Sequence, residues 1–203
     1  QTVRRRDGVI ACGGPLLVRT GDHTGRAPND RFIVKDDVSG PTVDWGSVNK
    51  PYSEEAFDRL FLRVRAYLQH QDVFVFDGYA GADPDNRLNV RIITETAWHN
   101  LFARNMFITE EDQDKLREFV PEFTVLNVPY FHGDPEIDDI ASQTFILVNF
   151  KKKLILIGGT AYAGEIKKSI FSIMNYLLPK KGVMTMHCSA NYGNDKDDVA
   201  LFF

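Results

Sequence analysis

Few cysteines, no long apolar run and no excess of positive charge set the first limits on this chain of 203 residues. Cys12 and Cys188 form no CxxC pair, which is ordinary for a protein of a reducing compartment. No apolar stretch approaches the roughly 20 residues that a membrane-spanning helix needs. The first residues, QTVRRRDGVIACGG, also lack a signal-peptide pattern. We therefore expect a cytoplasmic protein with no membrane partner.

The formal net charge of −4 argues against a nucleic-acid partner, which would favour a basic surface. Three short basic runs, at residues 4–6, 151–153 and 180–181, are expected only to face solvent. The chain begins without Met and ends on the apolar run VALFF, which we interpret as a cut from a longer protein. An apolar edge of this kind predicts self-association of the fragment.

The spacing of apolar residues predicts alternating helices and strands. Ser53, followed by two glutamates and an apolar stripe, predicts a helix over residues 54–70. Further helices are expected at 97–105 and from a capping box of Thr109 and Asp112 towards Phe119. Strands are expected at residues 8–18 with a break at 13–15, 32–34, 73–76, 89–94, and a hairpin of 144–150 with 153–157. The mixture predicts an α/β fold with a mixed sheet and flanking helices.

The stretch GGTAYAGEIKKSIFSIMNYLLP, residues 158–179, places two lysines near the start of an apolar helix. Cations are unfavourable there, because the N-terminus is the positive end of the helix dipole. At ~100° per residue, Lys168 falls opposite the apolar face and Lys167 at its border. The apolar face is expected to contain Ile166, Ile170, Ile173, Met174 and Leu177. The lysines either point into water or face an anion that shares the helix N-terminus.

Two other stretches carry candidate functional side chains. In VMTMHCSANYG, alternation predicts a strand with His187 on its polar face, as a structural residue, a metal ligand or a general base. In RTGDHTGRAPNDRF, glycines and a proline predict an irregular loop that presents Arg26. Its planar guanidinium could grip a carboxylate or phosphate, or pair with Asp22 or Asp30.

In this order, TGDHTGRAPNDRFIV, GGTAYAGEIKKSIFSIMNYLLP, MHCSAN and VALFF resemble the N-terminal portion of ATP-dependent phosphoenolpyruvate carboxykinases. The resemblance implies the N-terminal domain of that fold over residues 1–203, with the nucleotide-binding domain beginning at about 183–203. It also implies a carboxy-lyase of gluconeogenesis. In that reaction oxaloacetate loses CO₂ and the enolate takes the γ-phosphoryl group of ATP, giving phosphoenolpyruvate and ADP.

The resemblance also implies roles for five residues. Arg26 would grip the substrate carboxylate, and Tyr162 would line the substrate and CO₂ site. Lys168 and His187 would bind a catalytic Mn²⁺, and through metal and phosphate they would reach the nucleotide, which carries Mg²⁺. Lys168 would also contact substrate, and Lys167 would lie beside substrate and phosphate.

Two features depart from the family pattern. Ala27 and Asn29 stand where TGRSPKD is more usual, so a hydroxyl and a positive charge near Arg26 are lost. A GxxxxGK[ST] phosphate loop is also missing, so we expect the fragment alone to be inactive and to bind ATP weakly. Two other classes stay open: a Schiff-base enzyme using Lys167 or Lys168 on a keto acid, and a non-catalytic carboxylate-binding module.

Overall fold

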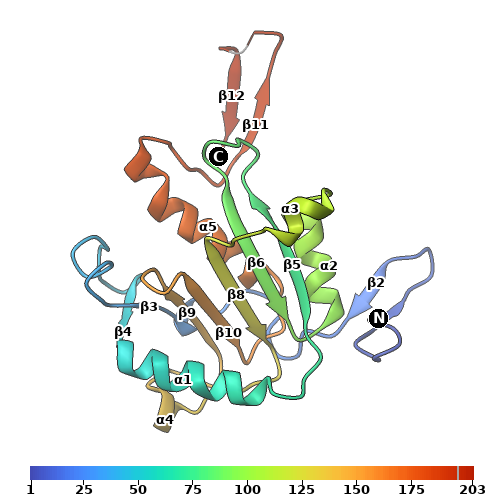
Figure 1. Cartoon of the computed structure of the whole chain (residues 1–203), viewed down its shortest axis with the longest axis vertical. Helices are drawn as coiled ribbons and strands as arrows, with labels where there is room; N and C mark the ends of the chain where they lie inside the picture. Colours follow the sequence, from blue (N-terminus) through green and yellow to red (C-terminus); the bar gives the residue numbers. More distant parts are fainter. Residues whose placement is uncertain (196) are drawn as a thin grey trace. The chain divides into compact units, whose positions relative to one another are not determined.

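The computed structural model describes residues 1–195 and 197–203. It divides into two compact units, Gln1–Ile170 and Phe171–Phe203, and the boundary lies inside helix α5 (Gly164–Leu177). The larger unit contains an eight-stranded mixed sheet in the order β4-β3-β9-β10-β8-β6-β5-β7 (Figure 1). Its strands are β3 (Arg31–Val34), β4 (Lys50–Tyr52), β5 (Phe74–Ala80), β6 (Leu88–Thr94), β7 (Ile108–Thr109), β8 (Phe123–Val128), β9 (Phe145–Asn149) and β10 (Leu154–Gly158). The predicted α/β class is confirmed.

Strand pairing places five side chains in one row across the middle of the sheet. Parallel pairing joins β3 to β4 and β9, and β8 to β6 and β10, whereas β9 with β10 is the predicted antiparallel hairpin. Directly paired residues point to the same face of a sheet. The row consists of Arg31, Ile146, Ile157, Asn127 and Thr94. Two polar ends of this row, Arg31 and Thr94, support the candidate site described below.

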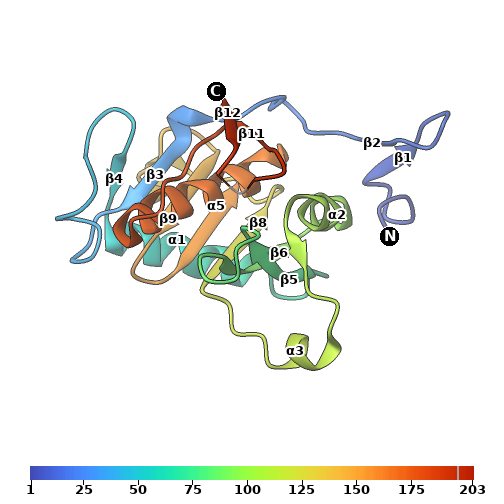
Figure 2. The ribbon, with the colours of Figure 1, turned by 90° about the horizontal axis from the view of Figure 1, so that it is seen from above.

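Helix α1 (Glu54–Tyr67) covers one face of the sheet (Figure 2). The side chain of Ser53 accepts a hydrogen bond from the Ala56 amide, as the predicted N-cap requires. Phe57, Leu60 and Val64 are fully buried in a cluster with sheet leucines, and each such side chain stabilises the fold by roughly 1.5–3 kcal/mol. The helix ends before the predicted residue 70, because His70 has a left-handed backbone (φ 66°).

The opposite face carries helix α2 (Ala97–Met106) and the first turns of α5 (Figure 2). The boundaries of α2 agree with prediction to within one residue. Ile166 and Ile170 of α5 are buried, as their predicted position on the apolar face requires. Both helices therefore run over the face that carries the row of paired residues.

The N-terminal strand is a hairpin of β1 (Gly8–Ile10) and β2 (Leu16–Val18). Its turn falls at the predicted break, where Gly13 (φ 88°) and Gly14 (φ 99°) have conformations that favour glycine. A single 3₁₀ turn, η1 (Pro28–Asp30), then leads directly into β3.

Three expectations were wrong in detail. Helix α3 (Gln113–Arg117) is capped by Asp112, whose carboxylate accepts from the Asp114 and Lys115 amides, whereas Thr109, the expected cap, lies in β7. Strand β5 continues to Ala80, beyond the predicted end at residue 76. The third error is the strand expected through His187, since β11 (Ser189–Tyr192) begins only after it and pairs with β12 (Val199–Phe202).

Five short elements and one central strand were not anticipated. The short elements are η1, β4, β7, α4 (Pro135–Asp138) and η2 (Pro179–Lys181). Strand β8 is the important omission, because it lies between β10 and β6. Its sequence, FTVLNV, is an apolar run just after Pro121, which is typical of a strand buried on both faces. Within the described residues, the helices are all too short or too polar to cross a bilayer.

Candidate functional site

The arginine loop and the lysine helix meet at the carboxylate of Glu165. This residue lies in the first turn of α5 and is only 4% exposed. Its Oε1 accepts a hydrogen bond of 2.7 Å from the amide of Ala27, the residue after Arg26. Burial raises the pKa of Glu165, while the Ala27 amide and then Arg26 and Arg31 oppose the rise. Glu165 therefore fastens the loop that carries Arg26 to the start of α5.

Arg31 is a second member of this cluster that the sequence did not reveal. It is the first residue of β3, and its pairing with Ile146 turns it to the face beneath α5. Burial lowers the pKa of its guanidinium; the Glu165 carboxylate opposes this and the charge of Arg26 adds to it. A local signal could have indicated the position of Arg31, because Pro28 begins a 3₁₀ turn that connects the Arg26 loop directly to β3.

The two lysines of α5 complete a positively charged cluster. Lys167 is exposed and Lys168 is half-buried, so Lys168 is the more enclosed of the two, contrary to the helical-wheel expectation. Burial is the main cause that lowers the pKa of Lys168, and the charges of Arg26 and Lys167 lower it further. The charges of Arg26 and Arg31 act on Glu165, and those of Arg26 and Lys167 act on Lys168, so four cationic side chains gather at the start of α5. Such an arrangement is suited to holding an anion with more than one negative charge.

The alternative prediction, a surface ion pair of Arg26 with Asp22 or Asp30, is wrong. Among the residues that the structure describes, Arg26 makes no salt bridge with Asp22 or Asp30. The Asp30 carboxylate instead accepts a hydrogen bond of 2.7 Å from the Ser142 hydroxyl. The guanidinium of Arg26 is exposed, and its charge acts on Glu165, Arg31 and Lys168.

Tyr162 lies in the turn between β10 and α5 and is half-exposed. Two glycines shape this turn. Gly159 has φ 68°, and a β-carbon there would collide with the Gln143 carbonyl. A β-carbon on Gly164 would collide with the Tyr162 ring, so the ring lies directly over the first residue of α5.

His187 belongs to the smaller unit, Phe171–Phe203, which is described by itself. It is exposed, precedes β11, and meets the Phe171 ring edge-on at 5.8 Å between centroids. The described residues contain no group of three or more His, Cys, Asp or Glu side chains suited to a metal ion. The nitrogen donors expected at Lys168 and His187 are thus not part of a preassembled carboxylate or cysteine cluster.

A cleft of about 1190 Å³ opens beside the cluster, against the β1–β2 hairpin. Its lining includes Arg19, His23 and His132, and it reaches the turn before α5 at Gly159 and Ala161. His23, which sequence reasoning left unassigned, also acts on the Glu165 carboxylate. The cleft therefore gives solvent access to the underside of the turn that carries Tyr162.

Comparison with known proteins shows the family of the chain. A family model described as phosphoenolpyruvate carboxykinase matches residues 1–203. Proteins named phosphoenolpyruvate carboxykinase (ATP) are similar to the whole chain: one from Geobacter sp. (strain M21) is 54% identical, and those from Bacillus subtilis (strain 168) and Caldanaerobacter subterraneus subsp. tengcongensis are each 52% identical. The chain spans 38% of the length of each of these relatives. The chain belongs to the ATP-dependent phosphoenolpyruvate carboxykinase family.

Proposed function

We propose that the full-length protein carrying this chain is an ATP-dependent phosphoenolpyruvate carboxykinase. It would decarboxylate oxaloacetate and transfer the γ-phosphoryl group of ATP to the enolate, giving phosphoenolpyruvate, CO₂ and ADP. The observation that carries the proposal is the meeting of the arginine loop and the lysine helix around Glu165, which collects four cations at one helix N-terminus. Substrate and products of this reaction are all polyanions except CO₂.

The residues of the chain would act mainly by binding and orienting. The guanidinium of Arg26 can hold a substrate carboxylate through two parallel charge-assisted hydrogen bonds. Loss of CO₂ leaves negative charge on the enolate oxygen, and phosphoryl transfer places charge on the equatorial oxygens. Lys167 and Lys168 would stabilise that charge in place of water. Tyr162 would line the pocket from which CO₂ departs.

We further propose that Lys168 and His187 are ligands of a catalytic Mn²⁺, with Mg²⁺ accompanying ATP. The chemistry of the donors supports this, since nitrogen ligands favour Mn²⁺ over Mg²⁺. A lysine can coordinate a metal only as the neutral amine, and the lowered pKa of Lys168 favours that form. A bound divalent cation would supply Lewis acidity to the enolate and phosphoryl oxygens.

Other parts of the interpretation remain proposals of the same kind. Residues 183–203 would begin the nucleotide-binding domain, and the protein would act in gluconeogenesis in the cytoplasm. Two free cysteines, Cys12 and Cys188, are compatible with a reducing compartment.

Self-association of the 203-residue chain is also proposed, through the edge formed by β12. Val199, Phe202 and Phe203 of this edge are 54%, 61% and 94% exposed. An apolar strand edge of this kind pairs readily with a second copy. Light scattering should show species larger than a monomer that become fewer on dilution, and a strictly monomeric profile at high concentration would contradict the proposal.

The test is a product assay on the full-length protein with Arg26→Lys as the informative variant. Wild-type protein should convert oxaloacetate and ATP into equal amounts of phosphoenolpyruvate and ADP. An ammonium cannot replace the two parallel bonds of a guanidinium, so apparent oxaloacetate affinity should fall roughly ten- to a hundredfold. Arg4→Lys, the same change at an exposed position outside the cluster, is the control and should leave affinity unchanged. Wild-type kinetics in Arg26→Lys would remove Arg26 from the binding site.

A Schiff-base enzyme would also use a lysine of lowered pKa, so a separate experiment distinguishes it. Protein treated with borohydride in the presence of oxaloacetate should keep its mass. A covalent adduct on Lys167 or Lys168 would favour the Schiff-base reaction instead.

A further inference from the structure

The turn that carries Tyr162 is held by side chains at two of its carbonyl groups. The Gly159 carbonyl accepts a hydrogen bond of 2.9 Å from the Thr144 hydroxyl. The Ala161 carbonyl, adjacent to Tyr162, lies 3.0 Å from Nε2 of His99. Both carbonyl groups lie just after Gly158, where the strand pairing of β10 ends. The two side-chain bonds therefore help to fix where the turn lies.

The partners of His99 fix which of its nitrogens carries the proton. A carbonyl oxygen can only accept, so Nε2 must be the protonated nitrogen that donates to Ala161. Nδ1 then has a lone pair and accepts from the Thr96 hydroxyl at 2.5 Å. The Thr94 hydroxyl in turn donates to the Thr96 carbonyl at 2.9 Å. Since Thr94 belongs to the row of paired residues, this relay connects the sheet to the turn.

His99 is a fixed donor and not a titrating group at ordinary pH. It is fully buried, with its ring stacked on that of Trp98 at 3.6 Å between centroids. Burial lowers its pKa to about 3, and the bond to Ala161 only partly opposes this. The imidazole therefore stays neutral and keeps one tautomer across the range in which enzymes of this kind are assayed.

The position of the turn passes directly to two parts of the candidate site. The amide of Tyr162 donates to the Thr160 hydroxyl at 3.2 Å, and its carbonyl accepts from the Glu165 amide at 3.2 Å. The Tyr162 ring lies over Gly164. A shift of Ala161 would thus move the Tyr162 ring and the first turn of α5, whose Glu165 holds the arginine loop.

We propose that His99, through its hydrogen bond to the Ala161 carbonyl, is a positioning residue for Tyr162 at the substrate site. The catalytic consequence rests on the proposed function, whereas the hydrogen bond and its tautomer can be tested without activity. His99 does not touch substrate; it acts through the backbone of the turn.

Two amide substitutions separate the two ends of the imidazole. In His99→Gln the amide nitrogen reaches the position of Nε2 and can still donate to Ala161. In His99→Asn the shorter side chain reaches only the position of Nδ1, so Thr96 keeps a partner and Ala161 loses its donor. In the full-length protein, kcat/KM for oxaloacetate should fall roughly threefold to tenfold in His99→Asn and remain near wild type in His99→Gln. Equal losses in the two variants would overturn the proposal.

A double-mutant cycle with Tyr162→Phe separates positioning from general destabilisation. If His99 acts by positioning the Tyr162 side chain, the kcat/KM loss in His99→Asn should be smaller in the Tyr162→Phe background. Losses that multiply in the double variant would mean that His99 serves stability alone. Thermal midpoints of all variants are measured in parallel, because a purely structural role would lower the midpoint without coupling to Tyr162.

The readout that does not need activity is the ¹⁵N spectrum of histidine-labelled protein. The resonance lost in His99→Gln should show protonated Nε2 and should not titrate between about pH 5 and 8. A resonance with protonated Nδ1, or one that titrates in that range, would overturn the proposal. Protein that keeps this signature but forms no phosphoenolpyruvate would refute only the proposed function.

Discussion

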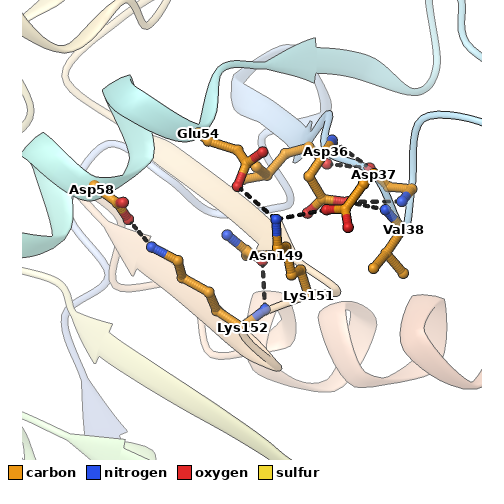
Figure 3. Close-up of polar contacts among 10 residues, drawn as sticks. Asp36, Asp37, Val38, Glu54, Asp58, Asn149, Lys151 and Lys152 are labelled. Atoms are coloured by element: carbon orange, nitrogen blue, oxygen red, sulfur yellow. Dashed lines mark hydrogen bonds and ion pairs between the residues drawn. The ribbon is translucent and has the colours of Figure 1, made fainter.

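Two pairs of adjacent lysines in this chain have opposite surroundings. Lys151 and Lys152 occupy the turn between β9 and β10, and Lys167 and Lys168 the start of α5. The first pair is met by acids: Lys151 Nζ lies 2.6 Å from Asp37 and 3.3 Å from Glu54 (Figure 3). In the second pair, the charge of Arg26 acts on Lys168. The same dipeptide therefore joins an ion-pair network in one place and lies in the proposed anion-binding site in the other.

The pKa directions express the same difference. The hydrogen bonds to Asp37 and Glu54 raise the pKa of Lys151, whereas burial and the charges of Arg26 and Lys167 lower that of Lys168. Lys152 pairs with Asp58 on α1, and its amide donates to Asn149 Oδ1 at 2.8 Å (Figure 3). Both lysines are exposed, as expected of this run, but they also pair with acids, which the sequence did not indicate. A lysine whose pKa is lowered by burial and neighbouring cations is a candidate functional residue.

The largest expected effect comes from removing the lone pair at Lys168. In the full-length protein, Lys168→Arg should weaken Mn²⁺ binding by at least about a hundredfold, the upper range of changes made only to the support of a ligand. The loss should match that of Lys168→Ala, because a guanidinium keeps the charge but stays protonated. Electron paramagnetic resonance of free Mn²⁺ measures the affinity. Lys151→Arg, the same change in the neutralised pair, is the control and should leave affinity unchanged.

The pH dependence sharpens this prediction. Deprotonating an ordinary lysine at pH 7 costs about 4–5 kcal/mol, and the lowered pKa of Lys168 reduces that cost. Because binding displaces a proton, Mn²⁺ affinity should rise with pH, by up to about tenfold per unit while the free amine is protonated. His187→Gln should make activity more dependent on added Mn²⁺. Unchanged Mn²⁺ affinity in Lys168→Arg would rule out Lys168 as a ligand.

Much of the fold was readable because its signals are local. The cap at Ser53, the helix of α2 and the β9–β10 hairpin follow from residues adjacent in sequence. Strand β8 was missed because periodicity cannot distinguish a buried strand from a buried helix in a short apolar run without alternation. The strand expected through His187 failed for the opposite reason, since six alternating residues satisfied the pattern without a paired partner there.

The candidate site divides in the same way. Arg26, Tyr162 and the α5 lysines were found through motifs, but their mutual arrangement was not. Glu165 and Arg31 were missed because their roles depend on contacts with residues far away in the sequence, such as the bond from Ala27 to Glu165. His99 carries no motif at all. Its importance comes from complete burial and one carbonyl partner, neither of which periodicity reports.

An intermediate effect is expected from Glu165→Gln, which keeps an oxygen for the Ala27 amide but removes the charge between the arginines. Oxaloacetate KM should rise only severalfold, less than in Arg26→Lys.

The stability change caused by Glu165→Gln should also depend on pH. The raised pKa means that folding favours the protonated acid, so wild type loses this contribution as pH rises from about 4.5 through the folded pKa. Over that pH range, the thermal midpoint of wild type should therefore fall relative to that of Glu165→Gln. A constant difference at all pH values, matching the exposed control Glu118→Gln, would contradict this.

The smallest effect is expected where the lysines are already neutralised. Lys151→Met keeps most of the length of the side chain but removes the ion pairs with Asp37 and Glu54. Water solvates these exposed carboxylates well, so the loss should be small. The thermal midpoint should fall by less than about 3 °C at low salt, and the difference should vanish near 1 M salt, where the screening length is about 3 Å. Because the pKa of Lys151 is raised, its contribution is complete below the unfolded pKa of about 10.5 and is lost as pH rises through the folded value.

Lys153→Met is the matched control for this turn. Lys153 has a left-handed backbone (φ 53°), which lysine and methionine adopt at a similar cost. It forms no ion pair within the described residues. Its midpoint should not depend on salt, and neither variant should alter oxaloacetate KM in the full-length protein. A salt-independent loss of more than about 5 °C in Lys151→Met would show that the side chain stabilises by packing. The contrast between a neutralised lysine pair and a ligand-binding one would then rest on Lys152 and its partner Asp58 alone.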